Sequence, residues 1–197
     1  MANVDRPNGL RPIGTISGSA WQGKVREYET TAATASAIGV GMAVIQEAAG
    51  NIEAATAADA ALILGVVVGI IPSGNSDPEK FMTTGNIGVQ TYPGYIPAAT
   101  AGRVLVAVGE DILFAVQSSG TLVAASRGAR INLGSNGIDT TTGRATGEIT
   151  ATAAQDASNQ LQLHDYVRSP DNDVTLANSE WIVSINQYQN SHGSIGI

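Results

Sequence analysis

Short apolar segments with alternating side chains, separated by glycine- and proline-rich turns, recur along the chain and constrain its fold most strongly. The alternation is clear at 25–30 (VREYET) and at 38–46 (IGVGMAVIQ), and a period of two residues predicts half-buried β-strands. The segment 62–71 is apolar almost throughout, which predicts a strand buried on both faces. Because no amphipathic helix of useful length interrupts this pattern, we expect an all-β, compact barrel-like or sandwich-like domain.

Two pairs of strands stand out in the second half of the chain. The segments 103–108 and 112–117 flank Gly109-Glu110-Asp111, which predicts a hairpin with a three-residue loop. The segments 161–167 and 181–186 predict the last two strands, separated by a long loop. Shorter strands are expected at 81–84, 87–92, 121–125, 129–133 and 145–152.

The first 24 residues, MANVDRPNGLRPIGTISGSAWQGK, form a segment of a different kind. Pro7 and Pro12 favour extended backbone, and the glycines of this segment oppose a helix. Bulky apolar residues are nevertheless spaced through it, which is unusual for a disordered tail: Leu10, Ile13, Ile16 and Trp21. We therefore predict an extended arm at 1–24, a β domain at 25–190 and a flexible tail at 191–197. The arm needs a surface to lie on, in its own domain, a sister subunit or a larger assembly.

The charge of the arm is opposite to that of the rest of the chain. Up to Arg26 the chain carries four basic residues and one acidic residue, whereas the whole protein has a net charge of −7. A basic arm on an acidic body favours acidic protein surfaces as its partners. Broad nucleic-acid binding needs a concentrated basic surface, so we expect no nucleic-acid partner. The most apolar run, 60–72, is too short to cross a bilayer, and we expect no membrane partner either.

Chemical motifs give no catalytic or metal-binding prediction. The absence of cysteine excludes disulfides and thiol nucleophiles, and neither a phosphate-binding loop nor a Gly-x-Ser-x-Gly turn occurs. His164 is predicted as a hydrogen-bonded side chain on the polar side of a strand rather than a general base. The run 171–173 (Asp-Asn-Asp) resembles the start of a calcium loop but lacks its later glycine and glutamate. The adjacent carboxylates at 110–111 are expected to point apart. We therefore predict no catalytic residue, no cofactor and no metal.

Both ends of the chain resemble a family of small virion proteins of tailed bacteriophages. The opening MANVDRPNGLRPIGTISGSAWQGKVREY is similar to the Asn-x-Asp-x-Pro-x-Gly-x-Arg-Pro arm with which that family begins. Residues 161–189 are similar to its ending, in which an Arg-x-Pro-Asp-Asn loop, here 168–172, precedes a final strand that runs into Ile-Asn-x-x-Gln, here 185–189. The resemblance implies a capsid decoration, or cement, protein on the outer surface of the virion head, with no enzymatic activity and no cofactor.

This resemblance implies that the protein binds the major capsid protein and itself, with a homotrimer favoured and a homodimer as the alternative. Leu10, Ile13 and Trp21 are then the candidate apolar anchors, because such groups in pockets dominate interface energies. Arg6 and Arg11 are the candidate partners for acidic groups, since the guanidinium binds carboxylates in a bidentate manner. The alternative for Trp21 is that it closes one end of its own domain.

Three other functions remain as alternatives. The first is a component of the phage tail or connector, which would occur in far fewer copies per particle than a cement protein. The second is a hydrolase of cell-wall glycan, which requires a pair of carboxylates in a cleft. The third is a receptor- or glycan-binding β module, for which Tyr92, Tyr95 and Tyr188 are the candidate residues.

Overall fold

The computed structural model of the protein describes residues 3–72 and 94–191. Within these residues the protein is almost entirely β-structure, arranged in open antiparallel sheets without an α-helix, which confirms the all-β, sandwich-like prediction. The described sheets do not close into a barrel. The strands expected at 81–84 and 87–92 lie outside the described residues, as does the tail beyond residue 191.

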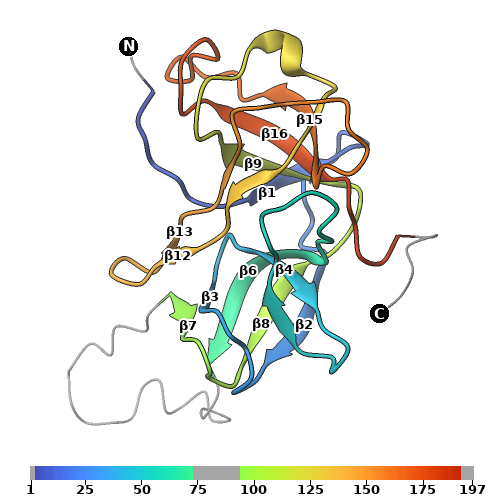
Figure 1. The fold of residues 1–197 in the computed structure, drawn as a ribbon, viewed down its shortest axis with the longest axis vertical. Helices are drawn as coiled ribbons and strands as arrows, with labels where there is room; N and C mark the ends of the chain where they lie inside the picture. Colours follow the sequence, from blue (N-terminus) through green and yellow to red (C-terminus); the bar gives the residue numbers. More distant parts are fainter. Residues whose placement is uncertain (1–2, 73–93, 192–197) are drawn as a thin grey trace.

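Two five-stranded sheets make up most of the fold, one in the upper half and one in the lower half of Figure 1. Sheet I has the strand order β1-β9-β16-β15-β10. Its strands are β1 (Arg11–Thr15), β9 (Ile112–Gln117), β16 (Glu180–Ile185), β15 (Leu161–Tyr166) and β10 (Arg130–Ile131). Sheet II has the order β2-β8-β6-β4-β5. Its strands are β2 (Val25–Thr30), β8 (Gly102–Ala107), β6 (Gly65–Pro72), β4 (Ala43–Gln46) and β5 (Ile52–Ala54).

Three two-stranded ribbons complete the described structure. They pair β3 (Ile38–Gly39) with β7 (Tyr95–Ile96), β11 (Leu133–Ser135) with β14 (Glu148–Ile149), and β12 (Ile138–Asp139) with β13 (Arg144–Ala145). A short 3-10 turn at Ala124–Ser126 occupies part of the segment expected as a strand at 121–125, so that prediction is wrong. Figure 1 shows β12 and β13 beside the boundary between the two sheets.

The apolar core consists of two clusters that share sheet II. The first cluster joins the two sheets and contains, among others, Val66 of β6 and Phe114 of β9. The second cluster lies on the other face of sheet II and contains Val67, the neighbour of Val66 in β6. Since successive residues of a strand point to opposite faces, β6 is buried on both faces at 65–67, whereas 68–71 are half-buried. The strand predicted at 62–71 is thus confirmed from residue 65 on, and its complete burial is not.

The predicted hairpin of 103–108 with 112–117 is wrong. Both segments are strands, but β8 pairs with β2 and β6 in sheet II, whereas β9 pairs with β1 and β16 in sheet I. Residues 109–111 therefore connect the two sheets instead of closing a hairpin. The physical reason is burial, because Ala107 and Ile112 both enter the cluster between the sheets, so the two strands contribute to one core from opposite sheets.

The strand expected at 38–46 is also divided in two. A turn at residues 40–42 separates β3 from β4, and Gly41 adopts a φ of 94°, which L-residues with a side chain rarely adopt. The two halves then pair with different partners, β3 with β7 and β4 with β5 and β6. This turn also receives the N-terminal arm.

Candidate partner-binding surface at the N-terminal arm

Residues 11–15 of the predicted arm form β1, an edge strand of sheet I. β1 pairs antiparallel with β9 from Arg11 opposite Ala115 to Thr15 opposite Ile112, with a bulge between Pro12 and Gly14. Proline is tolerated at an edge because its missing N–H removes no bond from the interior of a sheet. On the outer edge of β1, residues 14 and 15 are covered by the next turn of the chain, through the bridge of Gly14 with Ala20 and a 2.9 Å bond from the Thr15 N–H to the Ser19 carbonyl. No described strand pairs with this edge at residues 11–13.

Leu10 joins the arm to the core of the protein. Its side chain is 1% exposed and belongs to the cluster between the sheets, and its N–H donates to the carbonyl of Gly41 at 2.8 Å. Gly9 has a φ of 67°, and a Cβ at this position would lie 2.3 Å from the Gly41 oxygen. The backbone therefore approaches too closely for any side chain at residue 9. The predicted arm does not project from the domain at these residues but is part of its fold.

Two amide side chains bind the segment that precedes Leu10. Gln117, at the end of β9, accepts from the N–H of Arg6 at 3.0 Å and donates to the carbonyls of Val4 and Asn178 at 2.8 and 3.0 Å. Asn3 donates to the carbonyls of Asp173 and Ala177, both at 2.8 Å, and accepts from the N–H of Asp173 at 2.8 Å. The start of the chain is thus bound to both β9 and the loop before β16.

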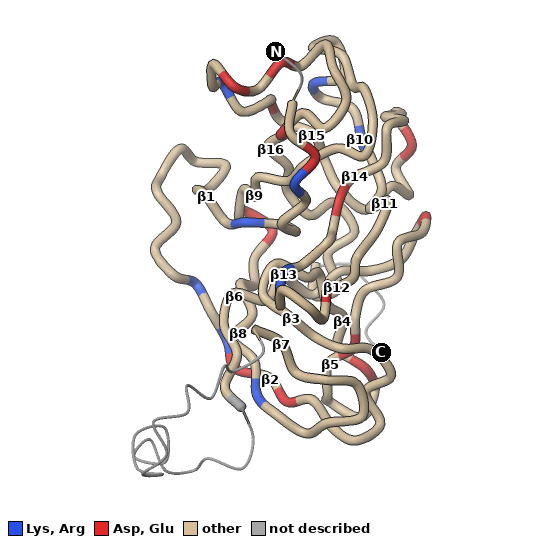
Figure 2. Tube along the Cα trace, turned by 90° about the vertical axis from the view of Figure 1, so that its left-hand side faces the viewer, with Lys and Arg blue, Asp and Glu red and all other residues tan. Residues whose placement is uncertain are grey.

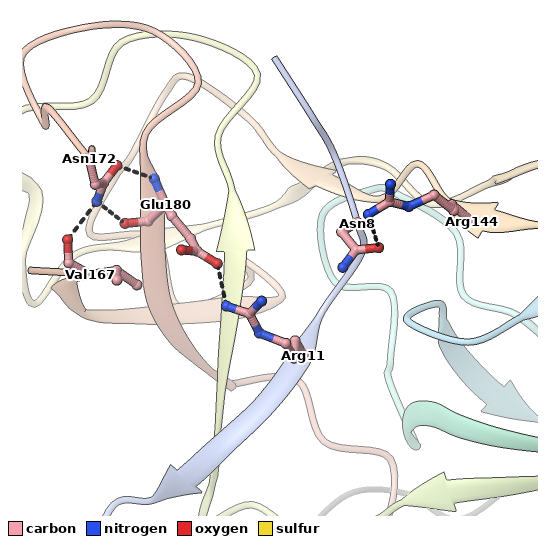
Figure 3. Close-up of polar contacts among 6 residues, drawn as sticks. All are labelled: Asn8, Arg11, Arg144, Val167, Asn172 and Glu180. Atoms are coloured by element: carbon pink, nitrogen blue, oxygen red, sulfur yellow. Dashed lines mark hydrogen bonds and ion pairs between the residues drawn. The ribbon is translucent and has the colours of Figure 1, made fainter. Parts of the chain in front are cut away.

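Asn172 organises that loop. Its side chain donates to the carbonyls of Val167 and Glu180 at 2.7 and 2.9 Å and accepts from the N–H of Glu180 at 2.8 Å (Figure 3). The three bonds close the loop between β15 and β16, while Asp171 and Asp173 on either side of Asn172 stay exposed. The two segments that carry the family resemblance, at the start of the chain and at 168–172, therefore lie against each other.

The predicted site residues divide into two groups. Arg6 and Arg11 lie beside the loop before β16, where Arg11 forms an ion pair with Glu180 at 2.7 Å (Figure 3). The side chain of Arg6 is exposed and forms no ion pair with the described residues. Ile13, the residue left unpaired at the bulge of β1, is 40% exposed and does not line that groove. Leu10 faces the core, so it is closed to a partner in this conformation.

Trp21 is half-buried and packs against the cluster between the sheets, as the alternative for this residue anticipates. Its indole Nε1 is buried without a hydrogen-bond partner among the described residues. Ile16, on the same connection between β1 and β2, is 54% exposed. The connection is fixed near both ends, since the N–H of Ile16 donates to the Asp111 carbonyl at 2.8 Å and Lys24 forms an ion pair with the Asp111 carboxylate at 2.5 Å.

A groove of about 390 Å³ lies between the arm and the loop before β16. Its charged lining consists of Arg6, Arg11, Arg144, Asp171 and Glu180. Arg144, from β13, reaches Asn8 at 3.4 Å from the side of the arm opposite to Glu180 (Figure 3). Four residues around the groove and the arm were not among the predicted site residues: Arg144, Asn3, Gln117 and Asn172. The two asparagines could have been found, because each is a fixed position of the terminal segments that resemble the phage family.

The other chemical candidates have structural roles. His164 Nε2 lies 2.9 Å from Ser184 Oγ, and burial lowers the pKa of this histidine below its usual value of 6.5, so it is a neutral hydrogen-bonded side chain at pH 7. Across 3–72 and 94–191, no three His, Asp or Glu residues are grouped so that they could hold a metal ion. The same part of the chain contains no helix with the length and apolar character needed to cross a membrane.

Comparisons with family models, with curated proteins and with solved structures give no match. Figure 2 shows that both acidic and basic segments occur in both halves of the molecule. Since the comparisons give no match, the function is inferred from the geometry and the charges of the arm.

Proposed function

We propose that this protein is a capsid decoration protein of a tailed bacteriophage, which binds the outer surface of the head and stabilises contacts between major capsid subunits. Two lines of support are independent of each other. The terminal segments resemble those of small phage virion proteins, and the same two segments form one ordered surface in the structure. A surface that is ordered before binding reduces the entropic cost of association.

The observation that carries the proposal is the exposure of Ile13 and Ile16 beside the open edge of β1. Both side chains are bulky and apolar, and both are more than a third exposed although they lie on an ordered part of the chain. The outer edge of β1 is uncovered at residues 11–13, and an edge of this kind is able to add a strand from a neighbouring protein, while the exposed apolar residues beside it provide side-chain contacts. Ile16 thus takes the anchoring role that was predicted for Leu10.

Trp21, on the connection between β1 and β2, gives further support for partner binding. Its Nε1–H group is buried without an acceptor, and a buried donor without a partner costs about 1–3 kcal/mol. An acceptor supplied by a bound partner would remove that cost, whereas the half-buried ring already contributes packing to its own core.

The self-association of the protein stays a prediction, with a homotrimer favoured over a homodimer.

The alternative functions find less support in the described residues. None of the described Tyr, Trp and Phe side chains is exposed, and Tyr95 and Tyr188 are half-buried, which is unfavourable for a glycan-binding platform; Tyr92 lies outside the described residues. A glycan hydrolase needs a free pair of carboxylates, but Asp111 and Asp165 form ion pairs with Lys24 and Arg168. A tail or connector protein would use the same face, and the number of copies per particle separates the two roles.

The proposal is tested by the binding of purified protein to undecorated heads of the parent phage. The variant Ile13→Asp/Ile16→Asp removes the apolar contacts without touching the core, and we expect at least a tenfold loss of affinity. Val123→Asp is the control, since Val123 is 55% exposed and lies far along the chain on the turn at 121–126. Equal binding by both variants and the wild type would contradict the proposed surface, and absence of the protein from virions would contradict the function.

A further inference from the structure

The groove between the arm and the loop before β16 contains more positive than negative charge, although the protein as a whole carries −7. Three arginines line it, from three different parts of the chain, against two carboxylates. Arg6 lies on the arm before β1, Arg11 begins β1, and Arg144 begins β13. A local excess of positive charge on an acidic protein attracts a ligand whose charge is negative and confined to a short segment.

Two of these arginines have their charge available for a ligand. Arg6 forms no ion pair within the described residues, and the Arg144 side chain makes among them a long hydrogen bond of 3.4 Å to Asn8. Elsewhere on the described surface, Arg103 forms a 2.8 Å ion pair with Glu27. Arg6 and Arg144 therefore carry charges that no described carboxylate neutralises, whereas Arg11 is paired with Glu180. Gln117 fixes the backbone of Arg6, and the pairing of β13 with β12 fixes Arg144.

We propose that this groove binds an extended acidic peptide segment of a partner protein, with Arg6 and Arg144 pairing with its carboxylates. Glu180 occupies Arg11 in the free protein and is displaced by a carboxylate of the bound segment. The side chains of Arg11 and Glu180 are 56% and 35% exposed, so this ion pair is accessible and contributes little to stability. That the partner is a capsid subunit rests on the proposed function, whereas the acidic character of the segment rests on the groove alone.

A peptide fits the groove better than a nucleic acid does. Asp171 and Glu180 lie among the arginines of the groove. A continuous row of phosphates would meet these carboxylates, while a peptide places its carboxylates at intervals and leaves uncharged residues between them. The backbone of an extended peptide also offers hydrogen-bonding groups to polar side chains in the lining, such as Asn8 and Asn178.

The test measures fluorescence anisotropy of a labelled octapeptide of alternating glutamate and serine with the isolated full-length protein. We expect Arg6→Gln/Arg144→Gln to weaken binding at least tenfold. Arg103→Gln removes one positive charge from β8, outside the groove, and is the control that should stay within twofold of wild type. We expect Glu180→Gln to strengthen binding severalfold, because it frees Arg11 while keeping the size of the side chain. Thermal unfolding of every variant checks that the fold is retained.

Weaker peptide binding by Arg6→Gln/Arg144→Gln together with tighter binding by Glu180→Gln would confirm that the groove binds the peptide and that Glu180 occupies Arg11 in the free protein. Equal losses with the double variant and with Arg103→Gln would overturn the proposal, since they indicate general charge attraction. Tighter binding of an oligothymidylate of equal charge through the same arginines would overturn the peptide assignment. The assay contains no phage particle, so a failure to bind the peptide does not contradict the decoration function. Conversely, absence of the protein from virions does not contradict peptide binding in the groove.

Discussion

Leu10 donates its backbone N–H to the carbonyl of Gly41 at 2.8 Å, and this bond joins the N-terminal arm to the turn between β3 and β4. The arm thereby contacts both sheets, since the next residues continue as β1 in sheet I while the N–H of Gly41 donates to Val67 of sheet II at 2.8 Å. The segment most suited by its sequence to bind a partner is therefore also a part of the core. Its stability and its binding properties can be tested separately.

Leu10→Ala should destabilise the protein by about 2–5 kcal/mol, because it removes a fully buried side chain from the cluster between the sheets. Urea unfolding followed by tryptophan fluorescence measures the change. Ile16→Ala, at an exposed position of the same segment, should change the free energy of unfolding by less than about 0.5 kcal/mol. A loss at residue 10 no larger than that at residue 16 would show that the arm is not packed as described.

Asn172→Ala should cost about 1–3 kcal/mol, since it leaves the carbonyls of Val167 and Glu180 and the N–H of Glu180 without their partner. The neighbouring Asp171→Ala is the matched control, because the Asp171 side chain is exposed and forms no hydrogen bond among the described residues. Thermal unfolding of the two variants compares them directly. Equal melting temperatures would rule out the role of Asn172 in closing the loop.

Glu148 makes the stability of the protein depend on pH. Burial, together with the negative charge of Asp5, raises the pKa of Glu148 above its usual value of 4.5. A raised pKa means that the folded state favours the protonated carboxyl, so this contribution to stability is present below the unfolded pKa and is lost as the pH rises through the folded pKa. Glu148→Gln should therefore raise the melting temperature at pH 7, and the difference from wild type should vanish towards pH 4.

The exposed Glu110 provides the comparison for that experiment. Glu110→Gln removes the same charge from an exposed position of the connection between the two sheets. We expect it to leave the melting temperature at pH 7 close to that of wild type. A melting temperature that rises equally in both variants would assign the effect to net charge instead of to the burial of Glu148.

Trp21→Phe should separate binding from stability. Phenylalanine retains an aromatic ring against the core and removes the buried Nε1–H that has no partner, so the free energy of unfolding should change by less than about 1 kcal/mol. If a partner accepts that hydrogen bond, affinity for phage heads should fall by about tenfold. A variant that unfolds like wild type and also binds like wild type would exclude Trp21 from the interface.

The strands that could be predicted from the sequence are those with a regular local pattern. VREYET forms β2 over the predicted residues, and the last two strands pair with each other as β15 and β16. Their alternation is a property of the segment itself, which explains why it could be recognised without the fold. The partners of β8 and β9 could not be predicted in this way, because the two strands belong to different sheets and do not pair with each other.

The arm shows the same limit for the candidate site. Leu10 stands between Gly9 and Arg11 in a segment that has the composition of an exposed strap. The burial of Leu10 depends on the close approach of Gly9 to Gly41, which cannot be predicted from a local sequence pattern. Arg6 and Arg11 line one groove, but their neighbours Arg144 and Glu180 come from distant parts of the sequence. Such a groove becomes visible only when the strand order is known.

The central claim is that the face of Ile13, Ile16 and the open edge of β1 binds a neighbouring protein on the phage head. Electron cryomicroscopy of intact virions, at a resolution that traces side chains, tests it most directly. The account predicts this protein on the outer surface of the head, with Ile13 and Ile16 covered by a capsid subunit or a sister copy. A map in which the protein is present but both isoleucines and the edge of β1 face solvent would contradict it.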